Sequence, residues 1–371
     1  MPLSKTAEWV PRPGIEWEQC EAALDRVGRP LPLYHRASWA RANETWGRKF
    51  RFIAIREHDR SFAGGFAVES FASRLLPTYR LLSVQRLSTG LGGLDADTVD
   101  AGLGELAAYA RGRNRVLRVT VDTFAMDADS SSKLSAALRR HGFSQVPTDR
   151  TYERSLFVDL AREEEEILAG FHATARRHIR SVAKNPVVVT GLESESDVPR
   201  LKELLEESVG RTGGSLHSNP WPELARLSWS APELSRIALL RRTDKSGPES
   251  ILAFAYGCMH GKVAEYSHSG ATRGSNLKIP MTYPLMWDLI KWARANGAQW
   301  FDLGGITSGT KEAGVPLGGI SDFKRYFSKE EREVGQQWEL EPSPGRAYVA
   351  RAIGRGVRLL RRGVDRARSH T

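Results

Sequence analysis

The stretch Ala264–Leu340 constrains the fold of this chain more than any other segment. It opens in a strand-like run, Val263–Ser267, and a loop then leads into a helical pattern. The apolar residues of that helix recur at helical spacing, at Leu285, Leu289, Trp292 and Ala293. Gly297 follows as a predicted helix C-cap, and Gln299–Leu303 predicts the next strand. The order strand, helix, strand indicates an α/β unit, in which ligands usually bind at strand ends.

Length and composition indicate a globular protein of two domains. The 371 residues exceed what one ordinary core holds, and 40% hydrophobic residues with 10 Trp are enough for two cores. Only Cys20 and Cys258 occur, far apart in sequence, which predicts a reducing compartment and no disulfide framework. No apolar run approaches the roughly 18 residues of a membrane span. We therefore expect a cytoplasmic protein.

Strand and helix patterns alternate along the rest of the chain and predict an α/β fold with mixed sheets. The first four strand patterns are Phe50–Arg56, Phe62–Ser73, Tyr79–Ser88 and Val116–Asp122. We place the domains at residues 1–150 and 151–342, with a basic tail at 343–371. The second domain is predicted to open with the strand Ser155–Leu160 and one helix that runs from Glu163 to Ala183.

Several features of the second half occur together in a fixed order. They are Ser269-Gly270-Ala271 after Tyr266, the segment WDLIKWA at Trp287–Ala293, Gly297, Phe301-Asp302, Gly304-Gly305 and Phe323-Lys324-Arg325-Tyr326-Phe327. In this order and spacing, the chain resembles the Fem-type (FemABX) peptidoglycan interpeptide-bridge aminoacyltransferases over roughly residues 34–341. The resemblance implies two tandem GNAT-like domains. It also implies transfer of an amino acid from aminoacyl-tRNA to an amine of a lipid-linked or UDP-linked peptidoglycan precursor, with no cofactor.

Lys324 is the first candidate catalytic residue, because the resemblance places the Lys of this motif beside the aminoacyl end of the tRNA. Phe323 and Phe327 flank it and can anchor it. Attack of an amine on an ester passes through an oxyanion, and the loss of one donor to such an oxyanion typically costs about 10²- to 10³-fold in rate. The alternative is a solvated Lys on an amphipathic turn.

Asp302 is the second candidate, since it precedes Gly304 and Gly305 at the predicted strand end. Its carboxylate could orient the attacking amine or accept its proton. It could equally cap the turn that the two glycines form.

Basic residues supply candidate contacts to the phosphates of a substrate. Arg176, Arg177 and Arg180 share a predicted helix, and Arg211 precedes Gly213-Gly214 in a predicted loop. The planar fork of Arg suits diphosphate and tRNA phosphates, but a solvated basic helix end gives the same pattern.

Tyr266 is a candidate substrate contact through the resemblance, with a packed strand Tyr as the alternative. His268 has no Cys or carboxylate at the spacing of a metal site, so we predict no metal. The motifs H-E-x-x-H, G-x-S-x-G and G-x-x-x-x-G-K-[ST] are absent, which argues against metalloprotease, esterase and P-loop functions.

The tail at residues 343–371 combines eight Arg with one Asp, and so carries +7 of the formal net charge of +10. Its apolar and basic residues follow separate faces of a predicted helix, which suits peripheral contact with an anionic membrane or RNA. Three glycines weaken this helix, so a frayed solubilising tail is the alternative.

Two further functions compete with aminoacyl transfer. The first is a GNAT acyltransferase that uses acyl-CoA to modify a polysaccharide or small amine. Its pyrophosphate motif, R-x-x-G-x-G/A, occurs only at Arg351–Gly356 in the tail and not in the loop Gly270–Pro280, where it would bind CoA. The second is an inactive adaptor that binds nucleic acid or membrane and needs the tail but not Lys324.

Overall fold

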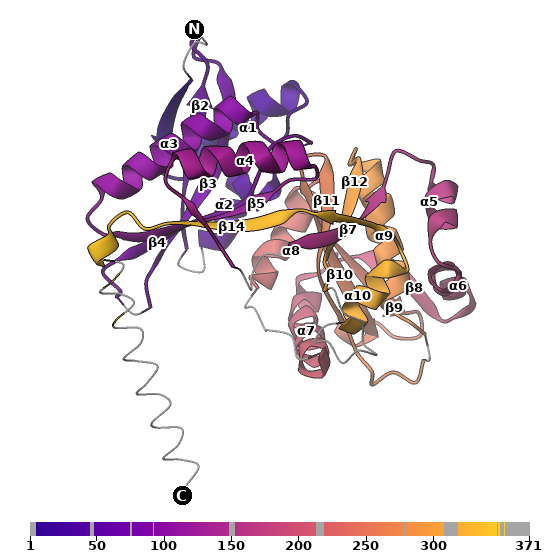
Figure 1. The fold of residues 1–371 in the computed structure, drawn as a ribbon. Helices are drawn as coiled ribbons and strands as arrows, with labels where there is room; N and C mark the ends of the chain where they lie inside the picture. Colours follow the sequence, from indigo (N-terminus) through magenta and orange to yellow (C-terminus); the bar gives the residue numbers. More distant parts are fainter. Residues whose placement is uncertain are drawn as a thin grey trace, which may run out of the picture.

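The structure is a computed structural model, and it describes residues 5–44, 48–74, 76–91, 93–147, 153–212, 219–277, 279–307 and 318–346, together with 348 and 352. Within these residues the strands form two seven-stranded mixed sheets, which Figure 1 shows side by side. The predicted α/β class with two tandem GNAT-like units is therefore confirmed. Most of the predicted tail helix lies outside the described residues.

The first sheet has the strand order β1-β2-β3-β4-β5-β14-β6. Its strands are β1 (Thr6–Val10), β2 (Lys49–Arg56), β3 (Phe62–Ala72), β4 (Arg80–Ser88), β5 (Val116–Phe124), β14 (Gly335–Leu340) and β6 (Ser144–Val146). The helices of this half are α1 (Ile15–Arg26), α2 (Ala37–Glu44), α3 (Ala96–Gly112) and α4 (Ala128–Arg140). The four strands predicted from the sequence are all present, because each pairs a β-branched or aromatic run with turn residues at its ends.

The second sheet repeats this order as β8-β9-β10-β11-β12-β7-β13. Its strands are β8 (Val187–Gly191), β9 (Ser235–Arg242), β10 (Ile251–His260), β11 (Val263–Ala271), β12 (Trp300–Gly305), β7 (Arg154–Asp159) and β13 (Glu330–Glu333). The helices are α5 (Glu164–Gly170), α6 (Ala173–Ser181), α7 (Val198–Thr212), α8 (Trp221–Ser230), α9 (Thr282–Ala295) and α10 (Gly318–Arg325). Every residue of β10 is buried, which explains its nearly continuous apolar sequence.

One strand crosses between the two halves. β7 opens the second half and lies in the second sheet, whereas β14 ends the second half and enters the first sheet between β5 and β6. Figure 1 shows β14, in yellow, running back into the violet half. The segments that lead into β7 and β14 contact each other, because the Val334 amide donates to the Glu153 carbonyl at 2.7 Å. The predicted second domain, 151–342, therefore gives its last strand to the first sheet.

The predicted helix Glu163–Ala183 is wrong as one element, because the chain breaks into α5 and α6 at Phe171 and His172. The ring of Phe171 is buried, and the His172 amide donates to the carbonyl of Tyr326 at 2.9 Å. The His172 ring then caps α6 by accepting from the Thr174 amide. The contacts of Phe171 and His172 with the segment after α10 therefore stabilise the break more than a continuous helix would be stabilised by its own hydrogen bonds here.

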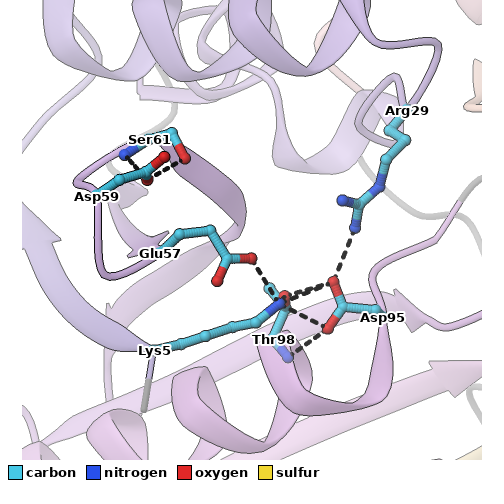
Figure 2. Close-up of polar contacts among 7 residues, drawn as sticks. All are labelled: Lys5, Arg29, Glu57, Asp59, Ser61, Asp95 and Thr98. Atoms are coloured by element: carbon cyan, nitrogen blue, oxygen red, sulfur yellow. Dashed lines mark hydrogen bonds and ion pairs between the residues drawn. The ribbon is translucent and has the colours of Figure 1, made fainter. Parts of the chain in front are cut away.

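A polar cluster fastens the first strand to the start of α3 (Figure 2). The Lys5 ammonium lies 3.0 Å from both Glu57 and Asp95 and donates to the Thr98 hydroxyl at 2.8 Å. Asp95 also accepts from the Thr98 amide as the N-cap of α3, and Arg29 lies 3.0 Å away. Burial raises the pKa of Asp95, but the Thr98 and Lys5 contacts outweigh it and lower the pKa to about 2.

Candidate active site

The site lies where the parallel strands β11 and β12 diverge. They pair only at Val263–Trp300, Ala264–Phe301 and Glu265–Asp302 within the described residues, although each strand continues beyond this point. On its other side β12 pairs with β7, with a register shift between Asp302 and Gly305. The backbone around Gly304 and Gly305 therefore borders a gap in the sheet that side chains from other elements can reach.

Asp302 lies inside β12 and is 3% exposed. Its Oδ1 accepts hydrogen bonds from the Ser155 hydroxyl and from the Gly304 amide at 2.8 Å. Its Oδ2 accepts one from Arg86 at 3.2 Å. Burial raises the pKa of Asp302, while Arg86 lowers it. These contacts match the turn-capping alternative, and a role in proton transfer stays a prediction.

Gly304 is required by its conformation and by its surroundings. Its φ is +77°, a left-handed conformation that glycine adopts without a steric penalty. A Cβ at this position would lie 3.2 Å from both the Lys324 Nζ and the Tyr266 carbonyl oxygen. The backbone and the ammonium can approach this closely because no side chain separates them.

Lys324 lies in the last turn of α10 and is 6% exposed. Its Nζ donates to the Gly305 carbonyl at 2.7 Å and lies 6.0 Å from the ring centroid of Tyr266. Burial lowers the pKa of Lys324 to about 8, against the charges of Asp302 and Glu265, which raise it. The solvated-Lys alternative does not describe this position, because the ammonium lies inside the protein at the diverging strands.

Phe323 and Phe327 belong to an aromatic cluster that holds α10 in place. Their ring centroids lie 5.2 Å apart, and both pack on Tyr283 at the start of α9. Phe327 is buried, and its ring centroid lies 5.2 Å from that of Phe171. The packing fixes the helix from which Lys324 projects, in the way the sequence motif predicted.

Tyr266 is half-buried on β11, and its hydroxyl shares a hydrogen bond with the Ser269 hydroxyl. Its ring lies on the side of β11 that faces Lys324. The structure therefore brings Tyr266, Asp302, Gly304, Gly305 and Lys324 together from three elements.

The four arginines do not converge on this point as one group. The Arg176 guanidinium donates to the carbonyls of Ala169 and Phe171, so it satisfies the end of α5. Arg177 and Arg180 are exposed on α6. Arg211 lies in the last turn of α7 and not in a loop, and its side chain is outside the described part of the chain.

A cavity of about 550 Å³ adjoins the motif and is lined by β7, the α5–α6 turn and residues 325–330. Its lining combines aromatic and basic side chains, among them Phe171, His172, Arg176, Tyr326, Phe327 and Lys329. Arg176 thus faces a cavity next to α10 while it supports the α5–α6 turn.

Two residues of the site were missed in the sequence, Arg86 and Glu265. Arg86 projects from β4 of the first half, and its guanidinium lies 2.8 Å from Glu265 and 3.2 Å from Asp302. No local pattern in the sequence connects positions this far apart. The one local signal for this part of the site was Glu265, because a charged residue at the otherwise apolar start of a strand indicates a buried partner.

Glu265 also belongs to a buried cluster with Cys258 and His260, whose ligand atoms all lie within 4.8 Å of one another. This spacing is compatible with a metal ion. However, the His260 Nε2 lies 3.3 Å from the Cys258 Sγ and 3.2 Å from Glu265, whose carboxylate already faces Arg86. A divalent ion would meet that guanidinium at close range, so the contacts favour the ion-free cluster. The absence of a metal stays a prediction.

Comparisons with known proteins agree with the fold. Residues 169–325 match the family model described as an acetyltransferase (GNAT) domain. The chain is similar to the solved structure of FemX, with 15% identity, 90% of this chain and 96% of that chain covered, and a TM-score of 0.70. No curated protein matches the chain.

Two further solved structures resemble it over most of their length. One is L-PGS from Bacillus licheniformis, with 16% identity, coverage of 94% and 99%, and a TM-score of 0.52. The other is a tandem GNAT protein from the clavulanic acid biosynthesis pathway, with 10% identity, coverage of 91% and 99%, and a TM-score of 0.50.

The two equivalent sheets, the diverging strands and the matched domain define a fold of two tandem GNAT-like units. Within that class the chain has the Fem-type fold, which confirms the resemblance drawn from the sequence. Among the described residues, no helix has both the length and the apolar character needed to cross a bilayer.

Proposed function

We propose that this protein is an aminoacyltransferase that moves an amino acid from aminoacyl-tRNA to an amine of a peptidoglycan precursor. The single observation that carries the proposal is the buried ammonium of Lys324, 2.7 Å from the Gly305 carbonyl where β11 and β12 diverge. The fold similarity to FemX supports the same reaction class.

In the proposed reaction, the amine of the acceptor attacks the ester carbonyl of the donor. A C–N bond forms, the C–O bond to the tRNA ribose breaks, and the ribose hydroxyl leaves with the proton that the amine gives up. The Lys324 ammonium would donate to the oxygen on which negative charge develops. With a pKa of about 8, this group is mostly protonated at neutral pH.

Acyl-CoA is the alternative donor, and the start of α9 argues against it. A GNAT-type CoA site binds pyrophosphate through backbone amides at a helix N-terminus. Here α9 begins at Thr282, and Pro280 and Pro284 on either side of it have no N–H to donate. Fewer amide donors are available for a pyrophosphate, which favours the tRNA-dependent reaction.

The test compares donors in one assay. The protein is incubated with a UDP-linked or a lipid-linked precursor and either total tRNA charged with labelled amino acids or labelled acetyl-CoA. We expect label to pass from tRNA to one precursor and not from acetyl-CoA. Transfer that persists after RNase digestion of the donor, or label taken only from acetyl-CoA, would overturn the proposal.

Two variants in the same assay distinguish the aminoacyltransferase from the inactive adaptor. Lys324→Met should lose turnover, whereas deletion of residues 343–371 should leave the chemistry in place. If the wild type and the Lys324→Met variant bind nucleic acid or membrane equally well and neither shows turnover, the adaptor function would be supported instead. Peripheral binding to anionic membrane through the tail, and a cytoplasmic location, are proposals that vesicle sedimentation and cell fractionation can check.

A further inference from the structure

Arg86 is the contribution of the first half of the chain to a site otherwise built by the second half. Its side chain is 12% exposed and crosses the boundary between the two sheets. One guanidinium nitrogen lies 2.8 Å from Glu265 on β11, and another lies 3.2 Å from Asp302 on β12. The fork thus contacts the last paired residues before the two strands diverge.

The backbone of β4 is distorted so as to aim this side chain. Arg86 has a φ of +49°, which is unusual for a residue with a Cβ, and the β4–β5 register shifts between Val84 and Leu87. The guanidinium also lies 3.6 Å from the ring centroid of Phe124 on β5. Strain of this kind persists only where surrounding contacts over-determine it, so the position of Arg86 is well fixed.

The charges around this point balance only when both halves contribute. The second half supplies the carboxylates of Glu265 and Asp302 and the ammonium of Lys324, and Arg86 supplies the second cation. A buried charge without a partner is costly, so the second half alone would hold one uncompensated carboxylate.

We infer that Arg86 is a positioning residue for the proposed reaction: it fixes Asp302 from across the domain boundary and thereby holds the Gly304 turn against the Lys324 ammonium. This inference rests on the proposed function. With Oδ2 of Asp302 held by Arg86, Oδ1 is available to the Ser155 hydroxyl and the Gly304 amide. The adjacent Gly305 carbonyl then receives the ammonium.

The test replaces Arg86 with Gln and compares it with Arg241→Gln. Arg241 pairs with the buried carboxylate of Asp197. Both residues belong to the second half of the chain, and they lie away from β12. Both variants break a buried ion pair, so both should lower the melting temperature. Only Arg86→Gln should lower kcat, by about 10²-fold with KM nearly unchanged, because a misplacement near 1 Å can cost this much.

The pH profile adds a readout that a purely structural role would not change. Burial raises the pKa of Asp302, and Arg86 lowers it. Among the described residues, the other charged or titratable groups that interact with this carboxylate are Glu265, Lys324 and Cys258, and His260 contacts Glu265. Without Arg86, Asp302 takes up a proton at higher pH, so the acid limb of kcat/KM should move upward in Arg86→Gln and not in Arg241→Gln.

Hydrogen exchange gives a result that does not depend on the donor. Amides of residues 302–307 and of α10 should exchange faster in Arg86→Gln than in the wild type, and at the wild-type rate in Arg241→Gln. An active wild type with equal kcat and equal exchange in the two variants would overturn the inference. An inactive wild type with the expected exchange would overturn the proposed function and leave the positioning role standing.

A double variant covers the case in which Arg86→Gln does not fold. Arg86→Gln with Glu265→Gln removes one charge of each sign and restores the balance, so it should fold. Its kcat should be about 10²-fold below that of the wild type, because Asp302 still lacks its partner. A double variant with wild-type kcat and wild-type exchange at residues 302–307 would refute the role of Arg86.

Discussion

The ammonium of Lys324 is the group on which the proposed chemistry depends. Lys324→Met keeps the length of the side chain but removes the charge and its donors. We expect kcat to fall by about 10²- to 10³-fold, as for the loss of one oxyanion donor, with a small change in KM. Steady-state transfer from charged tRNA measures this. Lys133→Met, at an exposed position on α4, is the matched control and should keep full activity.

The protonation of Lys324 predicts a basic limb in the pH profile. Burial lowers its pKa to about 8, so the ammonium is present below this pH and lost above it. We expect kcat/KM to fall tenfold per pH unit above about 8. Asp302→Asn removes the largest charge that favours the ammonium, so the limb should move to lower pH. Asp197→Asn changes another buried carboxylate and should leave the limb in place. A wild-type limb near the ordinary Lys value would contradict the role of this group.

The turn that ends β12 gives a prediction at the scale of an element. Gly304→Ala should cost about 1–2 kcal/mol of unfolding free energy for the left-handed conformation and should also push the Lys324 Nζ away. Gly297→Ala is a matched control, since its φ is +78° and nothing lies within 4 Å of the added Cβ. Urea unfolding should show similar losses for both, and only Gly304→Ala should lose activity. Equal activity of Gly304→Ala and Gly297→Ala would show that the Lys324 ammonium does not need its close approach to Gly304.

Elements that depend on local pattern could be predicted from the sequence, and those that depend on distant contacts could not. Helix α9 and its end at Gly297 were predicted because apolar spacing and a glycine after the last turn are local signals; the structure has Asn296 as the C-cap and Gly297, with a left-handed φ, directly after it. The break at Phe171 was missed because it depends on docking with Tyr326. Arg86 was missed for the same reason, since its carboxylate partners lie in the other half of the chain. The aromatic residues around Lys324 were predicted because they neighbour it in sequence.

At the scale of the whole molecule, Trp338 and Leu340 alternate with polar residues in β14, and this pattern does not determine which sheet the strand joins. Either sheet would bury the same face. The choice is set by the crossing at Val334, whose amide and carbonyl bond to Glu153 and Ala125 in the two connected halves. The sequence therefore predicted two tandem units but not the crossing of β14 into the first sheet.

The crossing of β14 into the first sheet predicts that the two halves unfold together. Trp338 on β14 is 1% exposed in the first sheet, yet Val334 alone separates β14 from β13 of the second sheet. Trp338→Ala should cost about 3–5 kcal/mol as a large-to-small core change. Because β14 ties the second half into the first sheet, amides of both β5 and β12 should exchange faster, with one urea transition by all probes. Trp338→Phe keeps most of the packing, so it should lose less unfolding free energy and speed amide exchange less, in the same two strands. Faster exchange confined to the first sheet would show instead that the halves are independent, and the coupling inferred for Arg86 would then rest on its ion pairs alone.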